Sequence, residues 1–269
     1  MSNQPSRESA SPQQTSVLPP DERPFCAPCR TLSLRAPWRW LQLGWQDFRH
    51  AIGPSFCCGL VIVGCGYSVI LMAFKYVNLS FLLPLLSGFV FLGPILAMAF
   101  YEISAQLQKD QQPTLTGAIR VSLSHLSDQM VFALILVIIF LVWARAASLL
   151  HVFFPIHSAQ PADLLLFFSI GTTVGALFSA FVFCINAFSL PMLMAKQTDS
   201  VTAVVTSFNA VLRNKGVMIV WSMLIVTAVV VGLLTGLLGL AVTLPWVGHA
   251  TWHAFQETID ASAWPDHEI

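Results

Sequence analysis

Two histidines near the end of the chain have the spacing of paired metal ligands. His249 and His253 lie four residues apart in the segment PWVGHATWHAF, residues 245 to 255. On a helix this spacing places both imidazoles on one face, where they can bind one metal ion. Stable sites usually use three or four ligands, and no third ligand is obvious nearby. A haem site is disfavoured. The two axial ligands must come from opposite faces of the porphyrin, and adjacent turns of one helix cannot supply both.

The same stretch also has the composition of a helix end at a membrane interface. Trp246, Trp252 and the two histidines carry amphipathic rings, which lie at headgroup depth and hydrogen-bond to their neighbours. In that interpretation the tryptophans contact lipid or a solute. A third alternative is a pH-responsive contact, since histidine titrates near neutrality. The residue types favour the interfacial role and leave the other two open.

Arg145 is the one charge well inside a predicted span. A buried guanidinium is costly, so such a residue is by default a candidate functional site. Its position about five residues from the end of the span lets it snorkel to the interface. If it faces inward instead, it would contact an anionic solute or a lipid headgroup, with Asn186 as a plausible partner.

Cys26 and Cys29 form a CxxC pair in the N-terminal segment. In other contexts such a pair supplies half of a zinc site or the redox centre of a thioredoxin-like fold. Neither context is predicted here, so the role of the pair stays open. The chain also lacks a phosphate-binding glycine loop, a nucleophile elbow, a zinc-protease motif and an acidic residue well inside a span. We therefore expect no enzymatic activity and no required cofactor.

The composition places these residues in a membrane protein. Of 269 residues, 56% are hydrophobic and 10% are charged, whereas soluble domains carry roughly 25% charged residues. The apolar residues come in blocks of about 20, the length that crosses a bilayer as a helix. The fold class we predict is all-α, with six spans at residues 51–74, 77–101, 130–150, 164–194, 217–237 and 239–257.

The boundary between the last two spans is weak. Residues 217–256 contain no Asp, Glu, Lys or Arg, and a continuous helix of that length would be far too long for one span. Gly232, Gly236 and Gly239 mark the place where we expect the chain to reverse. A re-entrant sixth segment is the alternative.

The basic residues predict the orientation. Eleven of the thirteen Lys and Arg residues fall on the side of the N-terminus, which indicates two cytoplasmic termini in a bacterial inner membrane. Residues 1–36 are rich in Pro, Ser, Gln and Arg and are predicted to be a disordered cytoplasmic tail. Residues 37–258 would form the six-helix membrane domain, and residues 259–269 a short second tail.

The spans fall into three similar units, each an amphipathic helix followed by two spans. The amphipathic segments are residues 40–50, 115–127 and 201–214, and Gly44, Ser122 and Ser207 are equivalent positions within them. The second span of each unit carries a proline eight residues before a polar position: Pro94 and Glu102, Pro191 and Asp199, Pro245 and His253. Recurrences of this kind indicate an internal repeat.

Two motifs resemble a known family. PWRWLQLGWQDF, residues 37 to 48, and the segment from Leu244 to Phe255 are similar to those of uncharacterised bacterial integral membrane proteins called domain of unknown function 2189. The resemblance covers roughly residues 33–258. Members often have a basic residue where this chain has Gln256, which argues against headgroup binding there. Some members are labelled cytochrome c oxidase subunits, so the resemblance implies a respiratory link, although six spans cannot supply the histidines of a catalytic subunit.

Together these features predict a non-enzymatic membrane scaffold or an assembly or accessory protein. The expected partners are the lipid bilayer and either a respiratory membrane complex or a second copy of the chain, with no nucleic acid. One alternative is a haem- or copper-handling accessory of a cytochrome c oxidase that uses His249 and His253. Another is a small transporter for an apolar or anionic solute, with Arg145 as the coordinating residue.

Overall fold

A computed structural model describes residues 17–19, 22–124, except 76–95, and 126–267, except 154–160. Within these residues the chain is helical, with two isolated β-bridges, so the all-helical class is confirmed. Residues 96–108 are helical as well. The named helices are α1 (Ala36–His50), α2 (Ile52–Lys75), α4 (Leu115–Ser124), α5 (Leu126–Phe153), α6 (Pro161–Ala195), α7 (Ser200–Arg213), α8 (Lys215–Leu234) and α9 (Leu240–Thr258).

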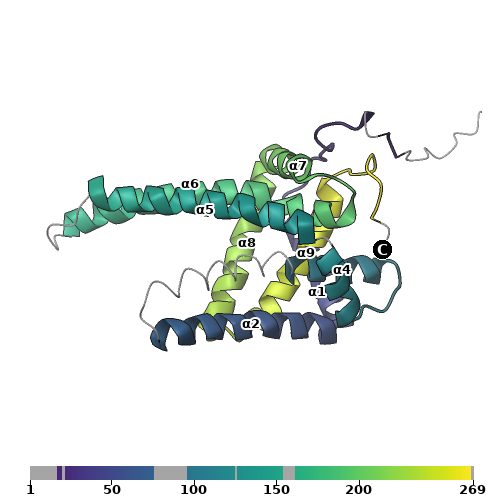
Figure 1. The fold of residues 1–269 in the computed structure, drawn as a ribbon, viewed down its shortest axis with the longest axis horizontal. Coiled ribbons are helices and arrows are strands. Elements are labelled where there is room, and N and C mark those ends of the chain that lie inside the picture. The colour runs from purple at the N-terminus through teal and green to yellow at the C-terminus, as the bar shows by residue number, and fades with distance from the viewer. Residues whose placement is uncertain (1–16, 20–21, 76–95, 125, 154–160, 268–269) are drawn as a thin grey trace, which may run out of the picture.

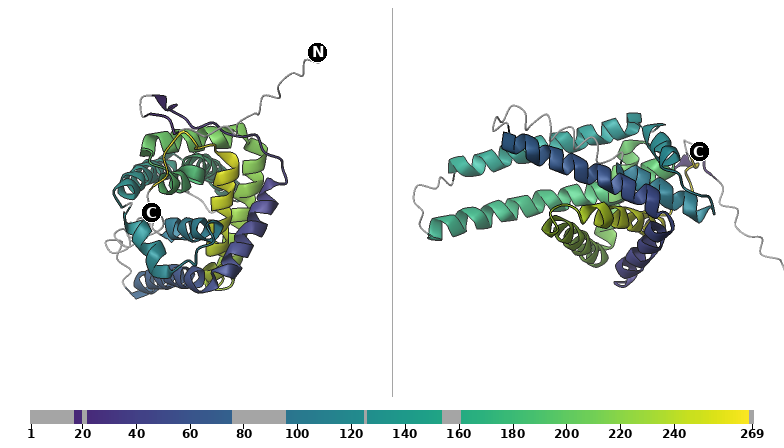
Figure 2. Two further views of the ribbon diagram at one scale, coloured as in Figure 1. Left: turned by 90° about the vertical axis from the view of Figure 1, so that its right-hand side faces the viewer. Right: turned by 90° about the horizontal axis from the view of Figure 1, so that it is seen from below.

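The helices run in two main directions. Helices α5 and α6 are long and lie side by side, and α2 runs in a similar direction on the opposite edge of the molecule, whereas α8 crosses their direction (Figure 1). Helices α1, α8 and α9 lie side by side and form a layer, which is seen clearly when the molecule is turned (Figure 2). In the described part of the chain the helices are therefore not arranged as one parallel bundle of spans.

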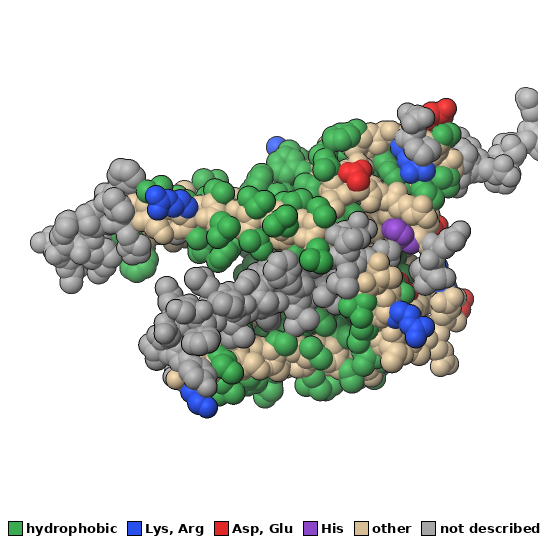
Figure 3. Space-filling model, viewed as in Figure 1, with side chains coloured by type: hydrophobic (Ala, Val, Ile, Leu, Met, Phe, Trp, Pro, Cys, Tyr) green, Lys and Arg blue, Asp and Glu red, His purple; other side chains and the backbone are tan. Residues whose placement is uncertain are grey.

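Three helices are long and apolar enough to cross a membrane: Ile52–Met72, Leu165–Ala195 and Lys215–Leu234. They correspond to the first, fourth and fifth predicted spans, and Met130–Ala146 in the third is apolar but shorter. Most of the second predicted span, residues 77–101, lies outside the described residues. Hydrophobic side chains cover the long helices in Figure 3. The membrane-protein class is supported, while the number of six spans and the orientation stay predictions.

The chain reverses between α8 and α9 where the glycines predicted it. Gly236 has a φ of 66° and Leu237 a φ of 71°, so both lie in the left-handed region. Glycine adopts this region without steric cost. Gly232 and Gly239 flank the turn at close range, with Gly232 Cα 3.1 Å from a Cβ built at Gly239. Helices α8 and α9 can therefore pack against each other after a turn of five residues, Thr235 to Gly239.

The N-terminal segment corrects the prediction of a disordered tail. Residues 1–16 and 20–21 lie outside the described residues, but residues 22–35 pack against α7 and the end of α9. The backbone N–H of Ala27 donates to Thr206 Oγ1 at 3.0 Å, and that of Leu32 donates to Asn214 Oδ1 at 2.9 Å. The Arg30 N–H donates to the carbonyl of Thr258 at 2.8 Å. These bonds satisfy backbone groups that an extended segment would otherwise leave unpaired.

The three predicted amphipathic segments are helices, and each buries its apolar face. Helix α1 packs along α9, and α7 packs along α6. In α4, Ala118 belongs to the same buried cluster as Ile103 of the helical residues 96–108. The three positions aligned from the sequence, Gly44, Ser122 and Ser207, are all buried in these contacts. The packing fits a duplicated unit, and the repeat itself stays a prediction.

Candidate polar site on the last helix

His249 lies at the centre of the packing around α9. Its side chain is fully buried, and its two ring nitrogens contact two hydroxyls: Ser55 Oγ of α2 lies 2.9 Å from Nε2, and Ser104 Oγ lies 2.8 Å from Nδ1. Phe100 packs its ring against the imidazole at 5.7 Å in a T-shaped contact. A neutral imidazole has one donor and one acceptor, so the two serines satisfy it completely.

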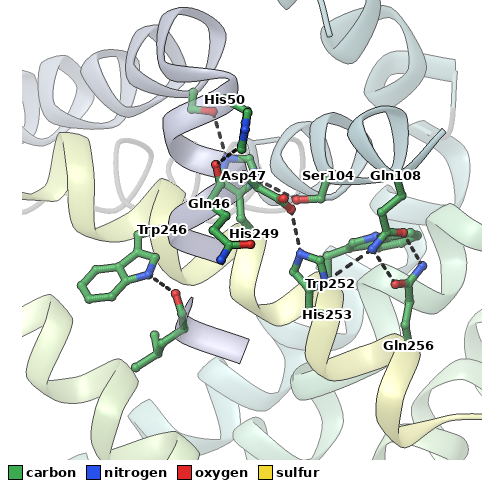
Figure 4. A network of polar contacts seen from close by, with 12 residues as sticks. Gln46, Asp47, His50, Ser104, Gln108, Trp246, His249, Trp252, His253 and Gln256 are labelled. Carbon is green, nitrogen blue, oxygen red and sulfur yellow. Dashed lines mark hydrogen bonds and ion pairs between the residues drawn. The ribbon is translucent and has the colours of Figure 1, made fainter. Parts of the chain in front are cut away.

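His253 lies one turn further along α9 and faces α1. Its Nε2 lies 2.8 Å from Asp47 Oδ2, and the two side chains are only 11% and 14% exposed. Gln108 Nε2 approaches the other ring nitrogen at 3.4 Å. Figure 4 shows the two imidazoles with different partners, Asp47 for His253 and Ser104 for His249. The pair shares a helix face, as the spacing predicts, but it does not point at a common ligand position.

A pair of amides extends the network to the end of α9. Gln108 and Gln256 exchange two hydrogen bonds of 2.8 Å each, and the indole N–H of Trp252 donates to Gln108 Oε1 at 3.1 Å (Figure 4). Trp246 donates its indole N–H to the carbonyl of Leu41 at 2.7 Å. Both tryptophans named as lipid or solute contacts therefore bond within the protein, and Trp252 is 5% exposed.

A glutamate at the end of α9 fixes the far side of α1. Glu257 accepts from the indole N–H of Trp40, which is fully buried, at 2.7 Å. Its other oxygen pairs with Arg39, and this contact raises the pKa of the guanidinium. Together with Asp47 and Trp246, these contacts join α1 to α9 along its length.

The arrangement does not assemble a nucleophile. Serine hydrolysis needs one imidazole between a hydroxyl and a carboxylate. Here the hydroxyls of Ser55 and Ser104 contact His249, and the carboxylate of Asp47 contacts His253. In the residues that the structure describes, no three His, Cys, Asp or Glu side chains are grouped to hold a metal ion. A metal ion on His249 would have to displace Ser55 or Ser104 from the ring nitrogen that it binds, and the metal interpretation stays a prediction.

Arg145 is not part of this network. Its side chain is exposed on α5, and the described cavities are lined by other residues. The structure therefore does not bring it together with His249 and His253. Whether it contacts a solute or a headgroup stays a prediction.

Cys26 and Cys29 pack on α7 rather than lying in a free tail. The amide of Asn209 donates to both sulfurs, at 3.5 Å and 3.7 Å, and both thiols are free. Burial raises the pKa of Cys29 to about 11, and the neighbouring Cys26 contributes to this shift. The thiolate is the reactive and metal-binding form, so this environment disfavours both roles at neutral pH.

Sequence reasoning missed four residues of the site: Asp47, Ser55, Ser104 and Gln108. Asp47 carried one usable signal, because it is the only acidic residue in α1. Its partner His253 is 206 residues away, however, and no local pattern pairs two positions at that distance.

Residues 82–195 match the model of a family described as predicted integral membrane protein (DUF2189). The matched segment is less than half of the chain. The match confirms the resemblance, although it covers a different part of the chain from the two motifs at residues 37–48 and 244–255. Among curated proteins and solved structures, none matches the chain. The family description carries no activity.

Proposed function

We propose that this integral membrane protein is a non-enzymatic scaffold or assembly factor, in which the histidines of α9 are structural. One observation carries the proposal: both ring nitrogens of His249 are satisfied by Ser55 and Ser104 in a fully buried position. A metal-binding imidazole needs a free ring nitrogen, and a catalytic imidazole needs a ring nitrogen within reach of a substrate proton. His249 would have to break its own packing to provide one.

The connectivity of the network supports the same role. It joins α9 to α1, α2 and residues 96–108, which lie far from α9 in the sequence, through polar contacts that are buried at His249, partly buried at His253 and exposed at Gln256. A satisfied buried network rigidifies a core and specifies one arrangement of its helices. In this proposal the α1, α8 and α9 layer is a fixed platform in the inner membrane, with both termini on the cytoplasmic side. It would present its surface to lipids, to a respiratory membrane complex or to a second copy of the chain.

The proposal is tested by measuring bound metal and the visible absorption spectrum of the detergent-purified protein. We expect a colourless, metal-free wild type. His249→Gln and His253→Gln should lower the unfolding temperature without changing either measurement. His50→Gln is the matched control, because His50 is exposed and its Nδ1 contacts only the carbonyl of Gln46 in its own helix. Its unfolding temperature should stay at the wild-type value.

The opposite result would favour a cofactor-handling accessory. A stoichiometric metal or a haem band in the wild type, lost in both α9 variants and kept in His50→Gln, would refute the structural role. The scaffold role itself requires a partner. Quantitative cross-linking in membranes should give one partner protein at a fixed ratio, and repeated recovery of the protein without one would count against it.

A further inference from the structure

An apolar groove lies between α6 and α8, away from the polar network. Its volume is about 580 Å³, and its walls include Ala180 and Phe183 of α6 and Ile219 and Val226 of α8. Lys215, the first residue of α8, lines one end. The groove thus combines a long apolar wall with one positive charge at its mouth.

The surface beside the groove is suited to hydrocarbon. Leu177 is 67% exposed, Ile219 60% and Met223 64%. Both helices are long and apolar enough to cross a membrane, and exposed apolar side chains on such helices are suited to contact lipid in a bilayer. The groove opens onto that surface and is accessible to an acyl chain from the side.

The charge at the mouth has no acidic counterpart in the part of the chain that the structure describes. Lys215 is exposed and forms no ion pair there. It lies at the junction with α7, an amphipathic helix that buries one face on α6. Lysines at the ends of membrane-spanning helices extend to the headgroup region, so in a bilayer the ammonium group of Lys215 at the start of α8 lies where lipid phosphates are found.

We propose that this groove binds an anionic phospholipid. One acyl chain lies between α6 and α8, and the negatively charged headgroup lies beside Lys215. Basic pockets between spans on the cytoplasmic side bind anionic headgroups by the same chemistry. The apolar wall selects an amphiphile over a free phosphate ion, and the lysine selects an anionic lipid over a zwitterionic one. This site is independent of the scaffold role and can fail or stand without it.

Native mass spectrometry of the purified protein, titrated with phosphatidylglycerol or with phosphatidylcholine of the same chain length, tests the proposal. One lysine near an anionic lipid surface contributes roughly 1 kcal/mol, or about fivefold in affinity. We expect the wild type to prefer phosphatidylglycerol by about that factor. Lys215→Gln should bind the two lipids equally, and Lys215→Arg should keep the preference.

Two further variants separate the headgroup from the groove. Arg213→Gln removes a neighbouring cation that does not line the groove, so it should keep the wild-type preference. Ala180→Leu fills the groove and should weaken binding of both lipids. Equal binding by the wild type, or an unchanged preference in Lys215→Gln, would overturn the proposal. A wild-type dimer that Ala180→Leu dissociates would also overturn it, because the groove would then be the seam between two copies.

Discussion

Substituting Gly44 by alanine should separate α1 from α9 and destabilise the layer of α1, α8 and α9 that carries the polar site. A Cβ at position 44 would lie 2.5 Å from the backbone nitrogen of Ala250 and 2.8 Å from its Cα. Ordinary contact begins at 3.4 Å, so the shortest separation falls short by about 0.9 Å. The obstructing atoms are backbone, and no side-chain rotation can relieve them. Over-packing of this kind costs about 1–3 kcal/mol.

Gly64→Ala is the control variant for the predicted loss of stability in Gly44→Ala. A Cβ at position 64 of α2 meets nothing within 4 Å, so this variant reports the gain of about 1 kcal/mol from replacing glycine in a helix. Both variants share this gain, and it cancels in their difference. The free energy of unfolding of Gly44→Ala should therefore be about 1–3 kcal/mol lower than that of Gly64→Ala.

Denaturant unfolding in detergent, followed by tryptophan fluorescence, measures the difference. The Asp47 and His253 contact, three residues from Gly44 on α1, should weaken as the helices separate. Equal stability of Gly44→Ala and Gly64→Ala would refute the reasoning, because it would mean that α1 and α9 do not approach as closely as the structure shows.

Two further predictions concern the start of α7 and the two cysteines that pack on this helix. Asp199 accepts from the N–H groups of Val201 and Thr202 at the start of α7, so Asp199→Ala should cost about 1 kcal/mol in thermal unfolding. Burial alone would raise the pKa of Asp199, but these hydrogen bonds outweigh it and lower the pKa. The contribution of Asp199 should be complete above about pH 4 and disappear as the pH falls through its lowered pKa. Alkylation at pH 8 should be slower at Cys29 in Cys26→Ser than at Cys26 in Cys29→Ser, because the pKa of Cys29 is raised to about 11; equal rates would contradict its burial.

The sequence predicted the local structure of the amphipathic helices better than their tertiary contacts. The periodicity of α1, α4 and α7 identified three amphipathic helices, because the apolar positions within one helix are set by neighbours three or four residues away. Gly44, Ser122 and Ser207, which the sequence aligned as equivalent positions of these helices, are all buried. The order of residues 22–35 was missed, since it depends on side chains of Thr206 and Asn214 that lie about 180 residues further on.

The histidine pair shows the same limit within the site. The four-residue spacing predicted that His249 and His253 share one face of a helix, and they do share one face of α9. What each imidazole contacts depends on which helix lies opposite at that height of α9. His249 faces Ser55 and Ser104, whereas His253, one turn later, faces Asp47. A single turn of about 5.4 Å is thus enough to change the environment from neutral hydroxyls to a carboxylate.

The order of helix packing explains why these partners come from the start of the chain. Helix α7 packs on α6, which precedes it, and Ala118 of α4 shares a buried cluster with Ile103 of the helical residues 96–108 before it. Helix α1, the first described helix, packs on α9, the last described helix. If the three units are copies, this contact closes a ring in which each amphipathic helix covers the final span of the unit before it. The polar site then lies at the closure of the ring, where the first unit supplies Asp47, Ser55 and Ser104 to histidines of the third.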